Sequence, residues 1–180
     1  MEARGRSRVE LHQVSRGDRA DYLAATRASI RLHRPWVDPP RSDAKFAALV
    51  RRAQKEEFEP MIVRRHEDGV IVGFFNLSQI IRGDLQSAFL GFGAVSGYEG
   101  RGYMTEGMVL VLRRAFTELR LHRVEANIQP ANTRSIALVR RCGFVREGFS
   151  ARYLKVGGRW RDHEHWAMYA ELWRRQHRRN

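Results

Sequence analysis

The segment best suited to chemistry is Gly100-Arg101-Gly102-Tyr103-Met104-Thr105, which stands just ahead of a helical pattern. Its two glycines allow a tight turn that exposes consecutive backbone N–H groups. Apolar residues recur at helical spacing over 104–119, so a helix starting here adds its own unpaired N–H groups and the positive end of its dipole. Together these groups form a cradle for an anion such as a pyrophosphate. A Gly-x-Gly pair is also common in plain turns, and this one completes neither a Walker loop nor a dinucleotide-binding fingerprint.

Two neighbouring segments strengthen this interpretation. The run 85–95 reads as a strand but contains Gly91 and Gly93, and glycine inside a strand marks a bulge or the close approach of a ligand or another backbone. A second strand–helix junction follows at 130–135, where Asn132 can bond an amide or simply cap the helix. Ser135 lies in the first turn of that helix, where its hydroxyl serves chemistry or bonds its own backbone.

The elements that must position these groups follow from periodicity and turn residues. We expect strands at 8–14, 61–63, 70–77, 85–95, 122–128, 144–155 and 159–169, and helices at 19–33, 43–57, 104–119 and 133–142. The fourth strand, the helix after it and the fifth strand form a crossover unit, which makes those two strands parallel. The others are close in sequence and favour antiparallel pairing. The chain is therefore predicted to be an α/β (α+β) domain with a mixed, mostly antiparallel sheet of about seven strands and four helices.

Composition limits the class of protein. The 180 residues suit one domain, with 43% hydrophobic and 29% charged residues, and no run approaches the ~20 apolar residues of a membrane span. The start of the chain has no secretory apolar core, and the single Cys142 excludes a disulfide framework within the chain, so a cytoplasmic protein without membrane association is expected. The charge of +13, from 33 basic and 20 acidic residues, favours polyanionic partners or reflects solvated arginines.

At five places the sequence resembles the GNAT superfamily of N-acetyltransferases, and most closely its RimJ/RimL branch, which acetylates N-terminal amines of ribosomal proteins. These places are Leu90-Gly91-Phe92, Gly100 to Glu106, Asn132-Thr133-Arg134-Ser135, Cys142-Gly143-Phe144 and Gly158 to His163. The resemblance covers about residues 9–172 of a single domain 1–180 and leaves a basic tail, 173–180. It implies the GNAT fold, in which the fourth and fifth strands are parallel and splay apart around acetyl-CoA.

The resemblance also implies roles for particular residues. The residues expected to bind acetyl-CoA are Phe92, Gly93, Ala94, Gly100, Arg101, Gly102, Tyr103, Met104, Thr105 and Asn132. Glu99 and Met104 depart from the family's pyrophosphate loop, and a carboxylate at 99 is expected to turn toward solvent. The tyrosine with which many members protonate the leaving thiolate falls on Val139, so Ser135 is expected to donate that proton, as its place in the RimJ/RimL pattern suggests.

The expected activity is transfer of acetyl to a primary amine, most consistently a protein N-terminal α-amine such as that of a ribosomal protein. Trp36, Trp160 and Asp162 are expected to line the acceptor site, although Asp162 also suits pairing with a nearby arginine. No metal is expected, because His163 and His165 share a strand face without an evident third ligand. Two alternatives stay open: a small-molecule amine acetyltransferase, and a catalytically weak ribosome- or RNA-binding protein of this fold. The partners expected from the charge include the ribosome or RNA, bound electrostatically, and the chain is expected to be a monomer or a dimer.

Overall fold

The structure, a computed structural model, describes residues 7–178. Its strands are β1 (Val9–Gln13), β2 (Phe58–Arg65), β3 (Ile71–Ile81), β4 (Ser87–Ala94), β5 (Arg123–Ile128), β6 (Val145–Val156) and β7 (Arg159–Tyr169). Its helices are α1 (Arg19–Ala28), α2 (Ile30–His33), α3 (Asp43–Arg52), α4 (Tyr103–Arg113), α5 (Thr133–Arg141) and α6 (Ala170–Arg178). A 3₁₀ turn (Arg16–Asp18) precedes α1, and a π-helical turn (Arg114–Glu118) extends α4.

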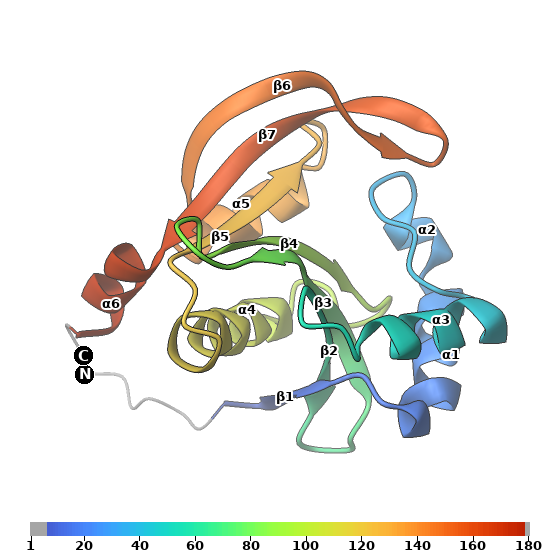
Figure 1. Cartoon of the computed structure of the whole chain (residues 1–180). Coiled ribbons are helices and arrows are strands. Elements are labelled where there is room, and N and C mark those ends of the chain that lie inside the picture. The colour runs from blue at the N-terminus through green and yellow to red at the C-terminus, as the bar shows by residue number, and fades with distance from the viewer. Residues whose placement is uncertain (1–6, 179–180) are drawn as a thin grey trace.

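All seven strands form one sheet in the order β1-β2-β3-β4-β5-β7-β6 (Figure 1). Every neighbouring pair within the described strands is antiparallel except β4 and β5, which are parallel. This confirms the predicted mixed sheet and the crossover through α4. The parallel pair lies at the middle of the sheet, where it joins the half formed by β1–β4 to the half formed by β5, β7 and β6.

Side-chain alternation along the strands divides the core into two layers. Phe75 and Leu77 face one side of the sheet, where they pack in a cluster with residues of α4 and α5 such as Met108 and Val139. Phe74 faces the other side, where Tyr22 of α1 and other residues of α1 and α3 cover β2 and β3. Helices therefore cover both faces of the first half of the sheet, whereas the hairpin half is covered on one face only (Figure 1).

The helix count differs from the prediction of four for two physical reasons. The segment expected as one helix from 19 to 33 breaks at the buried Ser29, whose Oγ donates to the Ala25 carbonyl at 2.7 Å and accepts the Ser96 N–H at 2.9 Å. Residues expected to form a tail from 173 belong, as far as 178, to α6, and the Trp173 ring lies 5.7 Å from that of Phe116. The remaining tail residues, 179–180, lie outside the described part.

The second strand begins earlier than expected, because Pro60 lies within β2 rather than before it. Its carbonyl accepts the Val14 N–H at 2.9 Å, just beyond the end of the β1–β2 ladder, where a missing donor is tolerated. The predicted turn chemistry holds elsewhere. Gly157 and Gly158 have φ of +57° and +79° at the hairpin turn, and Gly143 has φ of +85° after α5.

We predict that Gly107→Ala destabilises the protein, because Gly107 is the point where α4 approaches the sheet most closely. A Cβ there would lie 2.9 Å from side-chain atoms of both Phe75 and Val63. Alanine gains about 1 kcal/mol in helix propensity, but overpacking costs about 1–3 kcal/mol, so we expect a net loss of unfolding free energy in urea titrations. Val109→Ala, an exposed change on the same helix, should stay within about 0.5 kcal/mol of wild type. Equal stability of the two variants would contradict this packing argument.

Candidate active site

The central feature of the site is a fork between β4 and β5. Their parallel ladder contains only three residue pairs and ends where Phe89 faces Glu125. Beyond it β4 continues to Ala94 and β5 to Ile128, and the described strands pair no further with each other. The backbone N–H and C=O groups of β4 alternate between its two edges. Within Phe92, Gly93 and Ala94, the groups that point toward β5 therefore have no strand partner. An extended ligand with amide groups can pair with this edge.

The glycine-bearing turn before α4 has the backbone geometry of an anion cradle. Gly100 and Gly102 have φ of +73° and +87°, and Gly102 is the N-cap of α4 without a capping side chain. The N–H groups of Thr105 and Glu106 both donate to the Gly102 carbonyl, at 2.9 and 3.1 Å. Those of Gly102, Tyr103 and Met104 have no acceptor within the described chain. Three adjacent donors therefore stand at the positive end of the helix, where an anion is stabilised.

Both departures from the expected loop pattern are accommodated. The Glu99 carboxylate accepts the N–H of Gly97 at 2.5 Å in an exposed hydrogen bond, so it bonds its own loop at the protein surface. Met104 directs its sulfur toward Gly73 of β3, where a Cβ would lie only 2.3 Å from it. A glycine on β3 thus provides the space for a large residue at a position where the family has a small one.

An arginine from the start of the chain neutralises the carboxylate nearest the cradle. Arg8 donates its backbone N–H to Glu106 Oε2 at 2.7 Å and its Nε to Oε1 at 2.8 Å. Its Nη2 also donates to the Arg101 carbonyl at 2.9 Å, and its guanidinium lies 4.8 Å from the Tyr103 ring centre. Arg8 therefore holds the cradle from outside and offsets the negative charge that Glu106 brings to the first turn of α4. No sequence pattern predicts this contact, because Arg8 is 98 positions from its partner Glu106.

The second strand–helix junction places Asn132 and Ser135 on the first turn of α5. Asn132 Oδ1 accepts the backbone N–H of Ser135 at 3.2 Å, so Asn132 caps the helix. The half-buried Ser135 hydroxyl forms no hydrogen bond with a described residue and is free to donate. Val139, where the family tyrosine falls by counting, is fully buried in the core. Cys142 packs against the same core, and burial raises the pKa of its thiol to about 11, which makes it inert.

The loop after α2 spans the open end of the fork. His33 Nε2 lies 2.8 Å from the Ala94 carbonyl at the end of β4, and Gln129 after β5 donates to the Pro35 carbonyl at 3.4 Å. Burial lowers the pKa of His33, so this histidine is neutral at pH 7 and donates from Nε2. Trp36 is half-buried in the same loop, and its backbone N–H donates to the His33 carbonyl at 2.7 Å. Trp36 therefore lies in the loop that joins the two diverging strands.

A polar cluster that was not predicted from the sequence lies beside the fork. His165 Nδ1 is 2.5 Å from Asn127 Oδ1 and 3.6 Å from Glu125 Oε1, and its Nε2 is 2.9 Å from Ser150 Oγ. The Tyr153 ring lies edge-on to the His165 ring at 4.7 Å. These five residues come from β5, β6 and β7. Glu125 and Asn127 share a face because they are two positions apart on β5, and the register of β5 with β7 places His165 beside them.

The other two residues expected near the acceptor lie on the distal hairpin. Asp162 Oδ1 accepts the backbone N–H of Arg152 at 2.8 Å and thereby stabilises an irregularity in β6. Trp160 pairs with Lys155 near the turn, and its side chain is 62% exposed. Among the described residues, no hydrogen bond, ion pair or ring contact joins Trp160 or Asp162 to Trp36, and the acceptor role of these residues stays a prediction.

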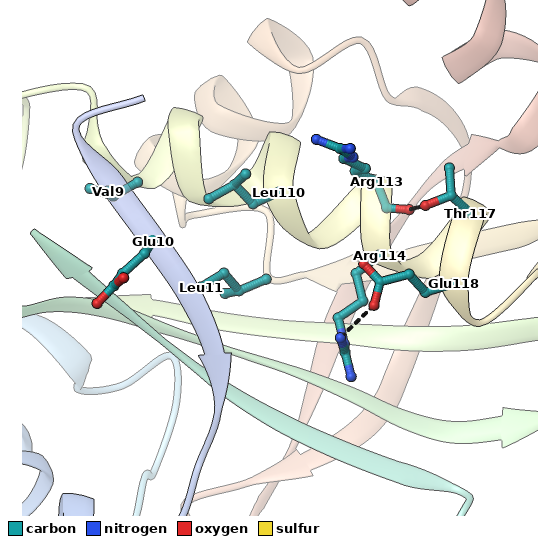
Figure 2. Close-up of a pocket in the computed structure, with 8 residues that line it drawn as sticks. All are labelled: Val9, Glu10, Leu11, Leu110, Arg113, Arg114, Thr117 and Glu118. Atoms are coloured by element: carbon teal, nitrogen blue, oxygen red, sulfur yellow. Dashed lines mark hydrogen bonds and ion pairs between the residues drawn. The ribbon is translucent and has the colours of Figure 1, made fainter. Parts of the chain in front are cut away.

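The remaining features of the described structure add no second reaction centre. A hollow of about 440 Å³ lies between β1 and the C-terminal half of α4, and Figure 2 shows the Arg114–Glu118 ion pair at its edge. Within residues 7–178, no three His, Cys, Asp or Glu side chains are grouped to hold a metal ion. No helix in this range has the length and apolar character required to cross a membrane.

An open mixed sheet whose two parallel strands part beside an amide-lined helix start is the architecture of acyl-CoA N-acyltransferases. The family model described as "Acetyltransferase (GNAT) domain" matches residues 8–145. The chain therefore belongs to the GNAT acetyltransferase family, and its named relatives support a RimJ/RimL-like branch.

Three relatives illustrate this placement. The chain is 39% identical over 113 residues to the probable N-acetyltransferase YjcK of Bacillus subtilis, covering 63% of this chain and 62% of that protein. It is 35% identical over 103 residues to the [ribosomal protein uS5]-alanine N-acetyltransferase of Escherichia coli, covering 57% and 53%. The match thus spans less than two thirds of each curated relative. The solved structure titled Mycobacterium smegmatis RimJ in complex with CoA-disulfide superposes with a TM-score of 0.81 at 32% identity, covering 91% of this chain and 82% of that one.

We predict that Arg8→Ala weakens coenzyme A binding about fivefold, because the cradle loses its external support and Glu106 is left uncompensated beside the bound anion. Because the Arg8 guanidinium is half exposed, we expect it to contribute about 1 kcal/mol to the free energy of coenzyme A binding, near the upper end for a surface pair. Isothermal titration with coenzyme A measures the effect, and Arg19→Ala, which removes an exposed arginine–aspartate pair remote from the cradle, is the matched control. Unchanged affinity in Arg8→Ala would show that the cradle does not depend on this arginine.

Proposed function

We propose that this protein transfers the acetyl group of acetyl-CoA, in the cytoplasm, to the α-amine of a protein N-terminus, such as that of a ribosomal protein. The observation that carries this proposal is the fork between β4 and β5 with an amide-lined turn beside it. The unpaired edge of β4 suits the amides of the pantetheine arm, and the free N–H groups of Gly102, Tyr103 and Met104 suit the diphosphate. Acetyl-CoA is the donor substrate of the reaction.

The transfer needs no covalent intermediate with the protein. The neutral amine attacks the thioester carbonyl carbon, a C–N bond forms, the C–S bond breaks and coenzyme A leaves as a thiolate that takes up a proton. Holding amine and thioester in the fork supplies much of the acceleration. A backbone N–H on the open edge of β4, near Phe92 or Ala94, stabilises the negative charge that develops on the carbonyl oxygen.

We assign the proton for the leaving thiolate to Ser135, acting directly or through a water molecule. Its hydroxyl forms no bond within the described chain, and its backbone N–H, rather than its side chain, is used in the helix cap. The fully buried Val139 has no proton to offer at the position of the family tyrosine.

The acceptor amine fits the polar cluster of Glu125, Asn127 and His165. The Glu125 carboxylate and the Asn127 side-chain oxygen can accept hydrogen bonds from an amine at the fork, and His165 lies between them. An α-amine has a reference pKa of about 8 and is partly neutral at pH 7, whereas a lysine amine, at about 10.4, requires a stronger base. The E. coli relative's name, which specifies a ribosomal-protein alanine, supports the same acceptor class.

A polyamine acceptor is the second candidate, because a spermidine N-acetyltransferase from Vibrio cholerae shares the fold with a TM-score of 0.79 at 20% identity. The charge of +13 disfavours it, since a polycation is repelled from such a surface.

We predict that the protein acetylates short peptides with free N-termini and varied first residues, at pH 7.5, at rates well above those for spermidine or for N-terminally blocked lysine peptides. Thiol release and mass spectrometry measure the transfer. Gly102→Glu should reduce coenzyme A affinity at least tenfold, because it adds a negative charge to the cradle and strains a φ of +87°. Gly83→Glu imposes similar strain at φ +67° in the turn between β3 and β4, at the opposite end of β4 from the cradle, and should bind normally. Faster turnover of spermidine would replace the peptide proposal, and normal affinity in Gly102→Glu would remove the cradle assignment.

We predict that Ser135→Ala lowers kcat about 100-fold, the usual scale of general acid catalysis, while KM for acetyl-CoA stays near wild type. The cap is made by the Ser135 backbone, so this variant should keep its melting temperature, whereas Asn132→Ala should lose about 1 kcal/mol of stability. Rates are compared from about pH 6 to 9. Full turnover by Ser135→Ala across this range would exclude Ser135 as the proton donor.

A further inference from the structure

The distal part of the β6–β7 hairpin is a two-stranded ribbon that projects beyond the rest of the sheet. β5 pairs with β7 only from Glu164 to Tyr169, so residues 159–163 of β7 have β6 as their sole strand partner (Figure 1). A ribbon of this kind buries little apolar surface and gains little stability from large apolar side chains. Trp160 nevertheless lies here with 62% of its surface exposed, and Phe149, 51% exposed, lies at the base of this ribbon, opposite Glu164. Exposed aromatic rings of this size can supply the apolar contacts of a bound partner.

Basic residues share one face of the hairpin with these two rings. Trp160 pairs with Lys155, and Phe149 pairs with Glu164 four positions further along β7. Alternation along β7 puts Trp160 and Glu164 on the same face as Trp166. The cross-strand partner of Trp166 is Arg146. The Trp166 ring also lies 5.2 Å from the guanidinium of Arg140, which belongs to α5. We define the hairpin patch as Arg140, Arg146, Phe149, Lys155 and Trp160.

The acidic groups on this face are already engaged. Glu164 lies 3.4 Å from Arg146 and accepts the indole N–H of Trp166 at 3.0 Å. Asp162 accepts the backbone N–H of Arg152. Among the described residues, no carboxylate pairs with Arg140 or Lys155. The face therefore carries a small net positive charge beside the two exposed rings.

This combination fits single-stranded RNA better than a protein partner. Phosphates neutralise cations along a backbone, and bases stack on exposed aromatic rings without sequence preference. Four residues of extended chain separate the two rings by about 13 Å, a distance that a few nucleotides can span. A second copy of this chain carries the same charge of +13 and would be repelled.

We propose that the hairpin patch binds single-stranded RNA, with phosphates contacting Arg140, Arg146 and Lys155 and bases stacking on Trp160 and Phe149. Apart from Trp160, which is also predicted to line the acceptor site, the patch contains no residue assigned to acetyl transfer, so either proposal can fail without the other. It provides a location for the polyanion binding that the overall charge suggests.

The test is fluorescence anisotropy of a labelled 12-nucleotide oligouridylate with the full-length protein between 50 and 200 mM salt. Three phosphate contacts predict a slope of log K against log salt of about −2. Trp160→Ala and Phe149→Ala should each weaken binding about tenfold, and Lys155→Glu by a similar factor. Arg51→Glu, an exposed arginine of α3, makes the same change in net charge outside the patch and should have a much smaller effect. Quenching of tryptophan fluorescence by the RNA should disappear in Trp160→Phe.

Several results would overturn the proposal. Equal weakening by Arg51→Glu and Lys155→Glu would mean that overall charge, not the patch, attracts RNA. Unchanged affinity in both aromatic variants would exclude stacking, and an absence of RNA binding would exclude the site. A dimer in light scattering that Phe149→Ala converts to monomer would assign the patch to a second copy. Lys155→Glu should acetylate peptides at the wild-type rate, so failure of acetylation in every variant and in wild type would count against the proposed function alone.

Discussion

The arrangement of this protein depends on an interrupted strand pair. Three residue pairs join β4 to β5, which is enough to hold the two halves of the sheet together, and the strands then diverge. Each half has its own support beyond that point, since α1 and α3 cover β2 and β3, and α5 packs under the hairpin half. The unpaired edges are therefore kept open by packing elsewhere. A fully paired sheet of the same composition would have no place for an extended substrate.

Electrostatic compensation makes the region beside this fork suitable for an anion. Glu99 and Glu106 both lie close to the start of α4, where uncompensated carboxylates would oppose a phosphate. Glu99 is bound by the backbone of its own loop, and Glu106 is paired with Arg8. The donors that remain free are backbone N–H groups, whose position depends on the chain conformation and not on side-chain identity. This explains how the loop tolerates residues that differ from the family pattern.

The two ends of the hairpin differ in character for a physical reason. Near the fork, β5, β6 and β7 lie together, and their polar side chains form a half-buried cluster. Toward the turn only two strands remain, and side chains such as Trp160 reach solvent, whereas His163 on the opposite face stays buried. Polar groups at the first end can hold a small amine, whereas rings and cations at the second are available to a large partner.

The sequence alone determined the order of the elements, the parallel crossover, the glycine turns at residues 100–102 and 157–158, and the strand–helix junction at Asn132. These are local properties, in which each signal and its consequence lie within a few residues. Sequence did not predict the break at Ser29 or the last helix, because buried contacts with distant residues decided both. Nor did it predict the Arg8–Glu106 pair or the place of His165 beside Asn127, which depend on strand order and register. Only the tertiary structure, which brings residues separated by tens of positions within hydrogen-bond distance, decides which polar side chains share a site.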